Sequence, residues 1–223
     1  MKPNAFLTAL LISFAWIPLS QAAVVASYDF ATNLTSGDTE ASSSASAIQS
    51  GGGLDAVDVG WGRSGSLSDL YIRSSNTSTS LTTDDYVSFT VTTNQGVSYD
   101  FTTLTFKYSA QITMTGVAQF TSNVVVRSSL DNFATDLGSF NVTRVSTGGT
   151  NILSPEPSVN LSAFTNVSGA VEFRFYVYDD VDNGQNLTRF DNITLNATVV
   201  PEVSGVSLVS IGSLLIGLRR RRR

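Results

Sequence analysis

The stretch VEFRFYVY, residues 171–178, decides the fold class because its side chains alternate in character from one residue to the next. One set is apolar: Val171, Phe173, Phe175 and Val177. The other set is charged or carries a phenol: Glu172, Arg174, Tyr176 and Tyr178. Successive side chains of an extended strand point to opposite faces, so this alternation predicts a β-strand with one face turned into a hydrophobic core.

The same period of two recurs between residues 23 and 200, where no segment shows sustained helical periodicity. Further strands are predicted at residues 23–30, 86–92, 104–108, 117–127, 137–145 and 193–199. Residues 31–56 are rich in Ser, Thr, Ala and Gly, and they predict a long loop with at most one weak strand. Roughly eight to ten short strands in one body predict an all-β fold, namely a two-sheet antiparallel β-sandwich of the jelly-roll type.

The composition excludes several kinds of chemistry. The 223 residues include no cysteine and no histidine, which removes disulfides, thiolate zinc sites and the usual general base near neutral pH. Between residues 23 and 200 the chain carries seven basic and 17 acidic side chains, a formal charge of −10. Such an acidic body repels phosphate backbones, so we expect no nucleic acid among its partners.

The N-terminus has the three parts of a secretory signal peptide. Lys2 supplies the positive charge, residues 6–19 form an apolar run, and Ser20 and Ala22 place small residues before a cleavage point. We therefore predict that residues 1–22 form a signal helix that the secretion translocon accepts. Signal peptidase is expected to cut after Ala22 or Ala23.

The C-terminus has a matching three-part layout. A short motif of Pro201, Glu202 and Val203 opens an apolar run that extends to residue 218. The chain then ends in a basic cluster: Arg219, Arg220, Arg221, Arg222 and Arg223. As a helix the apolar run spans roughly 24 Å, and snorkelling arginines can make up the difference from a bilayer core of ~30 Å. Arginines stay cytoplasmic, so we expect a C-terminal transmembrane helix with the body on the other side of the membrane.

This combination of a Pro-Glu-Pro-like motif, an apolar helix and a terminal arginine cluster resembles the PEP-CTERM sorting signal of Gram-negative bacteria. The sequence departs from that pattern at Val203, where the family usually has its second proline. The resemblance covers residues 201–223, and it implies that an exosortase, a membrane cysteine protease, recognises the tail. It also implies a link with extracellular polysaccharide and biofilm. The alternative is an ordinary C-terminal membrane anchor.

Three parts follow from these patterns: a signal peptide at residues 1–22, a β-sandwich domain at residues 23–200, and a sorting tail at residues 201–223. We expect an exported protein that is held transiently in the inner membrane. Its final location is then the cell surface or the extracellular space.

Two aspartates near the first and last predicted strands form a candidate calcium site. Asp29 closes the first strand and Asp191 opens the last, and these two strands usually neighbour each other in a jelly roll. The run DNI at residues 191–193 also resembles the end of carbohydrate-binding jelly-roll modules, where a terminal acidic residue often helps to hold a structural calcium ion. Without histidine or cysteine, a hard cation with oxygen ligands is the metal expected. The alternative is that Asp191 caps a turn and Asp29 pairs with Arg189.

A second acidic segment follows the clearest predicted strand. Asp179, Asp180 and Asp182 precede the Asn-Gly pair at residues 183–184, but their spacing departs from the calcium-loop pattern. We interpret this segment as a solvated turn, and as the second choice for a metal.

Three aromatic residues are candidate platforms for a glycan, because aromatic faces stack on sugar rings: Trp61, Tyr176 and Tyr178. Each of them also fits an ordinary core or sheet position. We expect no enzyme, since Glu40, Glu156 and Glu172 are far apart in sequence and lack the spacing of a glycanase strand.

The function predicted from these patterns is that of a non-enzymatic structural or adhesive component of the cell surface or matrix. The alternative is a carbohydrate-binding module that attaches the cell to a glycan. Exposure of Trp61 or Tyr176 in a groove would favour the module, and their burial would favour the structural role.

Overall fold

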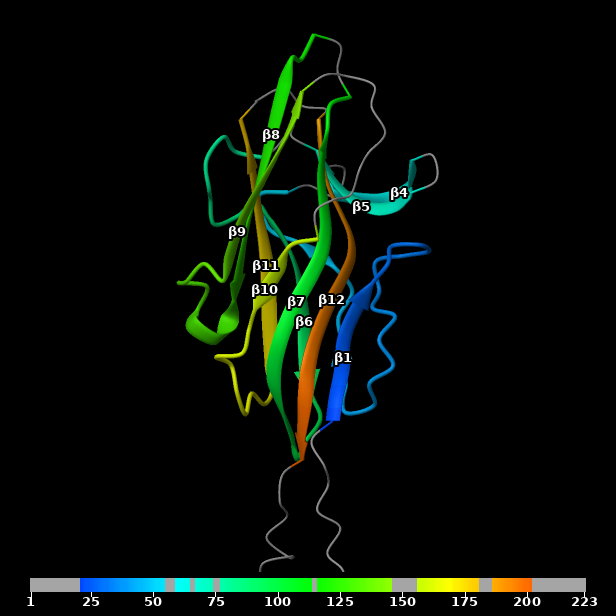
Figure 1. The fold of residues 1–223 in the computed structure, drawn as a ribbon, viewed down its shortest axis with the longest axis vertical. Helices are drawn as coiled ribbons and strands as arrows, with labels where there is room; N and C mark the ends of the chain where they lie inside the picture. The colour runs from blue at the N-terminus through cyan, green and yellow to red at the C-terminus, as the bar shows by residue number, and fades with distance from the viewer. Residues whose placement is uncertain are drawn as a thin grey trace, which may run out of the picture.

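The computed structural model describes residues 21–54, 59–64, 67–73, 77–113, 116–145, 156–180 and 186–201. These residues form twelve β-strands and one short 3₁₀-helix, η1 (Ser129–Asp131), and every pair of neighbouring strands is antiparallel. The strands are divided between two sheets that face each other (Figure 1). The all-β prediction and the two-sheet arrangement are therefore confirmed.

Each sheet contains six strands. The strands of sheet A are β1 (Gln21–Tyr28), β4 (Val59–Ser64), β5 (Leu67–Arg73), β7 (Val97–Gln111), β10 (Ser158–Asn160) and β12 (Leu187–Pro201). The strands of sheet B are β2 (Ser43–Ala45), β3 (Gln49–Ser50), β6 (Tyr86–Thr93), β8 (Gln119–Ser128), β9 (Gly138–Val145) and β11 (Ala170–Asp179).

The order of the strands is that of a jelly roll. If β2 to β5 are treated as an insertion, eight strands remain in the chain order β1, β6, β7, β8, β9, β10, β11 and β12. Sheet A then runs β1-β12-β7-β10, which is first, eighth, third and sixth. Sheet B runs β6-β11-β8-β9, which is second, seventh, fourth and fifth. This nested pairing of strands across two sheets is what two interlocked Greek keys produce.

Residues 31–56, predicted as a long loop with at most one weak strand, contain two short strands, β2 and β3, and the unpredicted strands β4 and β5 follow them. β2 and β3 pair with β6 and widen sheet B, whereas β5 pairs with β12 and carries β4 at the edge of sheet A. Two of these strands have only two or three residues, and β4 contains two glycines, so their local patterns are too short or too weak to identify.

Aromatic side chains fill the space between the sheets. The ring of Phe173 on β11 lies 5.6 Å from that of Phe89 and 5.7 Å from that of Phe101. Phe175, also on β11, lies 5.2 Å from Phe106. Phe101 and Phe106 belong to β7 in the opposite sheet, so these contacts hold the two layers together. The apolar set of residues 171–178 occupies the core, as the alternation predicts.

Strand β12 connects the halves of sheet A. It pairs with β7 along most of its length, from Leu187 to Pro201. On its other side it pairs first with β5, through Phe190, and then with β1, from Ile193 onward. The register with β7 shifts between Asp191 and Thr194, and a bulge of this kind twists a strand locally. The bulge therefore lies where β12 changes its neighbour.

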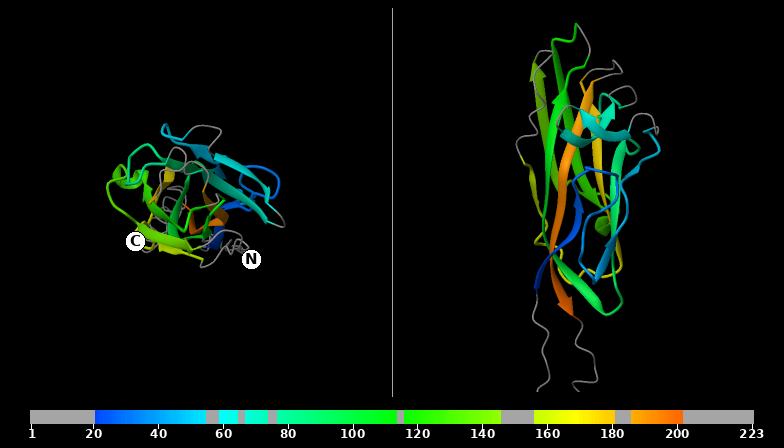
Figure 2. Two further views of the ribbon diagram at one scale, coloured as in Figure 1. Left: turned by 90° about the horizontal axis from the view of Figure 1, so that it is seen from above. Right: turned by 90° about the vertical axis from the view of Figure 1, so that its right-hand side faces the viewer.

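The beginning of β1 and the end of β12 lie side by side at one end of the sandwich (Figures 1 and 2). Gln21 is the register partner of Val199, and Pro201 is the partner of Val97 at the start of β7. The predicted adjacency of the first and last strands is thus confirmed. Cleavage after Ala22 would remove two residues from β1 and leave its buried part, which begins at Val25, intact.

The predicted signal peptide lies outside the described residues except for Gln21 and Ala22, and the predicted tail lies outside them beyond Pro201. Within the described part of the chain, no helix has the length and apolar character needed to cross a membrane. The signal helix and the transmembrane sorting helix therefore stay predictions.

Candidate functional site

A cluster of charged and aromatic side chains covers part of the outer face of sheet B. The guanidinium carbon of Arg174 lies 4.3 Å from the ring centre of Tyr86 and 3.7 Å from that of Phe133, so the cation is held between two rings. Glu172 accepts two hydrogen bonds from Arg174, at 2.8 and 3.2 Å. Phe133 follows η1, and this contact fixes the loop after β8 against the sheet.

Tyr176 belongs to this cluster and is not an exposed platform. Its ring lies 5.3 Å from that of Tyr86, and Arg127 covers it with a guanidinium carbon 5.3 Å from the ring centre. Only 2% of Tyr176 is exposed, so its face is not available to a sugar. Alternation places Tyr176 on the outer face correctly, but sequence spacing could not reveal that Arg127 from β8 lies over it.

Tyr178 has a different environment. It is half-buried on the outer face, where its register partner is Asn123 on β8, and Asn123 is in turn the partner of Asn141 on β9. Asn141 is exposed, and Asn123 donates a weak hydrogen bond of 3.4 Å to the Tyr178 carbonyl. One aromatic ring and two amides therefore form a row across three strands, which we call the Tyr178 row. Thr121 and Thr143, hydrogen-bonded at 3.1 Å, lie beside it.

Trp61, the third predicted platform, lies on β4 as the register partner of Leu70. Its side chain is outside the part of the structure that is described.

The outer face of sheet A contains a buried ion pair. Arg189 on β12 is 1% exposed and Asp69 on β5 is 0% exposed. Nη2 of Arg189 donates to Oδ1 of Asp69 at 2.6 Å, and Nη1 donates to the side-chain oxygen of Gln111 on β7. Nε also lies 2.6 Å from Oδ2, as an ion contact without the alignment of a hydrogen bond. Burial raises the pKa of the Asp69 carboxyl, and Arg189 opposes that rise.

This pair corrects the alternative in which Asp29 would neutralise Arg189. Asp29 comes after β1, whose last residue, Tyr28, is opposite Ile193, whereas Arg189 lies in the part of β12 that pairs with β5. The sequence could not identify Asp69 as the partner, because the β5–β12 pairing joins segments about 120 residues apart and β5 itself was not predicted.

Asp29 and Asp191 lie in the same region but do not form a ready-made metal site. Asp29 accepts a hydrogen bond of 3.0 Å from the Ala31 amide, and Asp191 accepts one of 2.8 Å from the Asn192 amide. Burial raises the pKa of Asp191, the Asn192 bond and Lys107 lower it, and the charges of Asp69 and Asp29 add to the rise. Among the described residues, no group of three or more acidic side chains is placed to hold a metal ion. Carbonyl ligands would have to complete a calcium site, so calcium stays a prediction.

The second acidic segment is only partly described. The side chain of Asp179 is buried and accepts a hydrogen bond from the Thr77 hydroxyl. Asp180 accepts one of 2.7 Å from the Thr121 amide. Asp182 lies outside the described residues. The two described carboxylates thus hold neighbouring segments in place. The prediction of a solvated turn is wrong for Asp179, which belongs to the end of β11 and is buried, whereas Asp180 is exposed.

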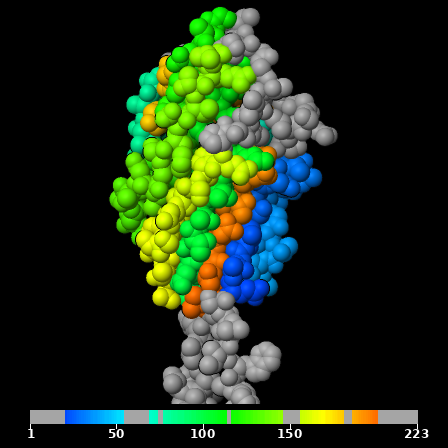
Figure 3. Space-filling view, in the orientation of Figure 1, coloured from blue at the N-terminus to red at the C-terminus, as the bar shows by residue number. Residues whose placement is uncertain are grey.

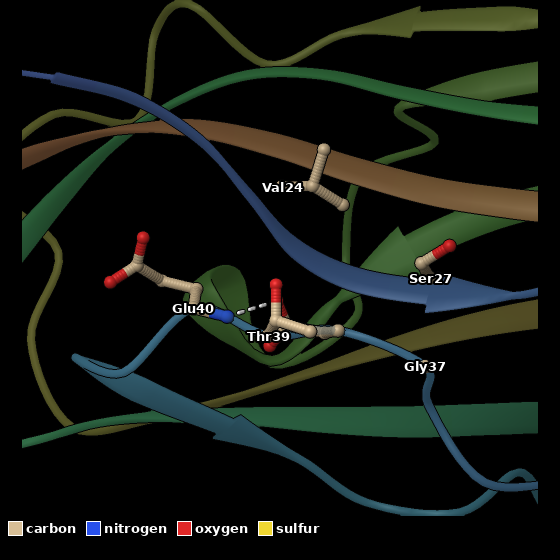
Figure 4. Close-up of a pocket in the computed structure, with 6 residues that line it drawn as sticks. Val24, Ser27, Gly37, Thr39 and Glu40 are labelled. Atoms are coloured by element: carbon tan, nitrogen blue, oxygen red, sulfur yellow. Dashed lines mark hydrogen bonds between the residues drawn. The ribbon is translucent and has the colours of Figure 1, made fainter.

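A pocket of about 380 Å³ lies beside β1 (Figure 4). Its lining residues are Val24, Ser27, Gly37, Asp38, Thr39 and Glu40. Asp38 accepts a hydrogen bond of 2.7 Å from the Glu40 amide, and Glu40 accepts bonds of 2.6 and 3.0 Å from the hydroxyl and amide of Ser42. Burial raises the pKa of Asp38, whereas the Ser42 hydrogen bonds lower that of Glu40. Both carboxylates therefore stabilise the conformation of their own loop through local hydrogen bonds.

Comparison with known proteins gives no family. No protein-family model matches the chain, and no curated protein matches it. Among solved structures, a carbohydrate-binding module that recognises mannan shares 11% identity over 79% of this chain and 98% of its own, with a TM-score of 0.39. An adhesin domain of Lys-gingipain from Porphyromonas gingivalis shares 18% identity over 78% of this chain and 99% of its own, with a TM-score of 0.41. A second adhesin domain of that protein shares 14% identity over 80% of this chain and 98% of its own, with a TM-score of 0.33. Likeness at this level assigns neither a family nor a ligand.

The buried ion pair yields a stability prediction. Asp69→Ala leaves the guanidinium of Arg189 buried without its counter-charge, and we expect a loss of about 3–5 kcal/mol in the free energy of unfolding. Asp136→Ala is the control, because its ion pair with Arg127 is also 2.6 Å long but half-exposed, and it should cost less than ~1 kcal/mol. Denaturant unfolding of both variants measures the difference. Equal losses would contradict a special role for the Asp69–Arg189 pair.

The calcium prediction is tested by thermal unfolding. Calcium bound at Asp29 and Asp191 would stabilise the folded state by mass action, so the melting temperature should rise in calcium and fall in a chelator. Asp191→Ala should abolish that difference. An identical melting temperature of the wild type in both buffers would dispose of the site, and a calcium shift that survives Asp191→Ala would move it elsewhere.

Proposed function

We propose that this protein is exported and that its β-sandwich is displayed at the cell surface or in the extracellular matrix as a non-enzymatic structural or adhesive component. The observation that carries the proposal is the position of the two described ends. β1 begins and β12 ends at the same end of the sandwich, with Gln21 opposite Val199. If the segments before β1 and after β12 are anchored in a membrane or matrix, a domain with this layout projects away from the anchor as one unit.

The arrangement suits the predicted flanking signals. The first residue of the predicted sorting motif, Pro201, is also the last residue of β12, so the tail would begin directly where the folded domain ends. An exosortase-type enzyme would act on the tail in the membrane, with the folded domain next to the tail on the non-cytoplasmic side. The translocon, signal peptidase and exosortase are accordingly the partners that we propose.

A structural or adhesive role agrees with the environment of the polar groups. The burial of Tyr176 favours this role over a glycan platform at that residue. Asp38 and Glu40, the two acids of the pocket beside β1, bind their own loop through hydrogen bonds. These hydrogen bonds give both carboxylates a structural role in their loop, which supports the proposal of a non-enzymatic body.

The second candidate function is that of a carbohydrate-binding module, and the Tyr178 row favours it. A tyrosine ring can stack on a sugar, while the amides of Asn123 and Asn141 can donate to and accept from hydroxyl groups. The row carries no formal charge, which suits a neutral polysaccharide as the ligand.

Processing of the tail tests the first proposal. The protein should be produced in hosts with and without an exosortase, and the mass of the surface or secreted form should be measured. We expect the exosortase host to yield a form that lacks Arg219 to Arg223. A mature surface protein that retains all five arginines would contradict exosortase processing and leave the ordinary membrane anchor.

Glycan binding tests the second proposal. Tyr178→Ala should weaken binding of the purified chain to a polysaccharide identified on a glycan array by about tenfold, which corresponds to ~1.4 kcal/mol. Tyr178→Phe retains the ring and should bind as the wild type does. Thr92→Ala, an exposed position on β6 of the same sheet, is the matched control. If Tyr178→Ala binds normally, the Tyr178 row is not the site.

A further inference from the structure

Strand β9 (Gly138–Val145) forms one edge of sheet B. All eight of its residues are in register with Gln119–Val126 of β8, without a shift. No other described strand pairs with it, and the sheet order places it at the end of the row. β9 lies on the flank of the sandwich in Figure 1, and the yellow-green surface in Figure 3 is on the same side. The backbone N–H and C=O groups of every second residue of β9 therefore point away from β8, toward the outside of the sheet.

This edge has only one of the features that usually prevent pairing with another chain. Natural edge strands are blunted by lysine, proline, inward charges, bulges or very short length. β9 has eight residues, a regular register, no proline and no lysine. Its one charged side chain, Arg144, alternates with Phe140 and Val142 and is an inward charge near the end of the strand. Four alternate side chains are exposed: Ser139, Asn141, Thr143 and Val145. Val145 is 65% exposed, more than any other large apolar side chain among the described residues.

We propose that β9 pairs with β9 of a second copy of this chain, antiparallel and about a two-fold axis at Asn141. The sequence of the strand is self-complementary in this register. Asn141 faces Asn141 of the second copy, Ser139 faces Thr143, and Phe140 faces Val142. Hydroxyl with hydroxyl and aromatic with β-branched residue are cross-strand pairs that stabilise a sheet. Two opposed amides can each donate a hydrogen bond to the other and accept one from it.

The inner face of β9 also gains from this pairing. Phe140 and Val142 pack against the core but remain partly exposed, and the ring of Phe140 lies 5.5 Å from that of Phe106. In the dimer, Phe140 of each copy lies against Val142 of the other copy. This contact buries apolar surface of both side chains that is exposed in the single chain. Arg144 faces Gly138 of the other copy, so the two guanidinium groups lie at opposite ends of the interface and do not repel each other at the axis.

The pairing has a consequence for the outer face. Sheet B becomes one continuous sheet through both copies, with β9 strands in its centre. The Tyr178 row then runs without interruption from Tyr178, Asn123 and Asn141 of one copy into Asn141, Asn123 and Tyr178 of the other. The inference rests on the strand edge alone and does not depend on either proposed function.

The first experiment uses the natural absence of cysteine. In the full-length chain, purified in detergent, Asn141→Cys places one thiol from each copy on the two-fold axis. Directly opposite residues of an antiparallel pair have Cβ atoms ≈ 4.5–5.5 Å apart, close to disulfide geometry. A mild oxidant should convert most of this variant to a covalent dimer. Thr92→Cys, exposed but on an interior strand of the same sheet, should stay monomeric.

The second experiment measures the non-covalent dimer of the cysteine-free chain by native mass spectrometry in glycan-free buffer. Asn141→Lys sets two like charges against each other at the axis, and we expect it to weaken the dimer roughly fivefold or more. Thr92→Lys should leave the dimer unchanged. The inference is overturned if Asn141→Cys cross-links no better than Thr92→Cys, or if Asn141→Lys dimerises as the wild type does. Export and glycan binding are measured separately, so failure here leaves the proposed functions standing.

Discussion

The pairing of β12 on both of its sides is the constraint on which the rest of the structure depends. This strand runs for fifteen residues through sheet A, and the backbone groups along it need partners on two sides. β7 supplies one side along most of its length, while β5 and β1 share the other. Because β1 comes first in the chain and β12 last, this pairing brings the termini of the sandwich together. The shift at Asp191 and Asn192 lets one strand serve two successive neighbours.

The same change of neighbour explains where the buried charges lie. The half of β12 beside β5 carries Arg189, and β5 presents Asp69 to it. The half beside β1 begins after the bulge, so Asp29 and Asp191 are at the junction and bind local backbone amides. Asp69 therefore neutralises Arg189 on one side of the junction, and Asp191 at the junction lies opposite Lys107 on β7. A hard cation there would draw on Asp29, Asp191 and nearby carbonyl oxygens, which stays a prediction made from the sequence.

The two faces of sheet B carry separate tasks. Its inner face packs phenylalanines against β7, and its outer face combines a self-contained cluster around Arg174 with the more open Tyr178 row. In the cluster, Arg174 lies over Tyr86 and Arg127 lies over Tyr176, so the ring of Tyr176 is not accessible to a ligand. The row retains an exposed amide at Asn141, and this residue lies on the strand whose outer edge pairs with no other described strand. Ligand contact and self-association would thus share one residue, Asn141.

The sequence by itself determined the class of fold and the inner face of β11, because side-chain alternation is a local property with a period of two. The adjacency of the first and last strands was an expectation taken from the jelly-roll type, and the β1–β12 pairing confirms it. The sequence also determined the absence of disulfides and of histidine chemistry. The tertiary structure alone decided the partner of Arg189, the burial of Tyr176 and the insertion of β2 to β5, since each depends on register between segments far apart in the chain. A one-residue slip moves every side chain to the other face, and spacing within one strand does not encode its alignment with the next.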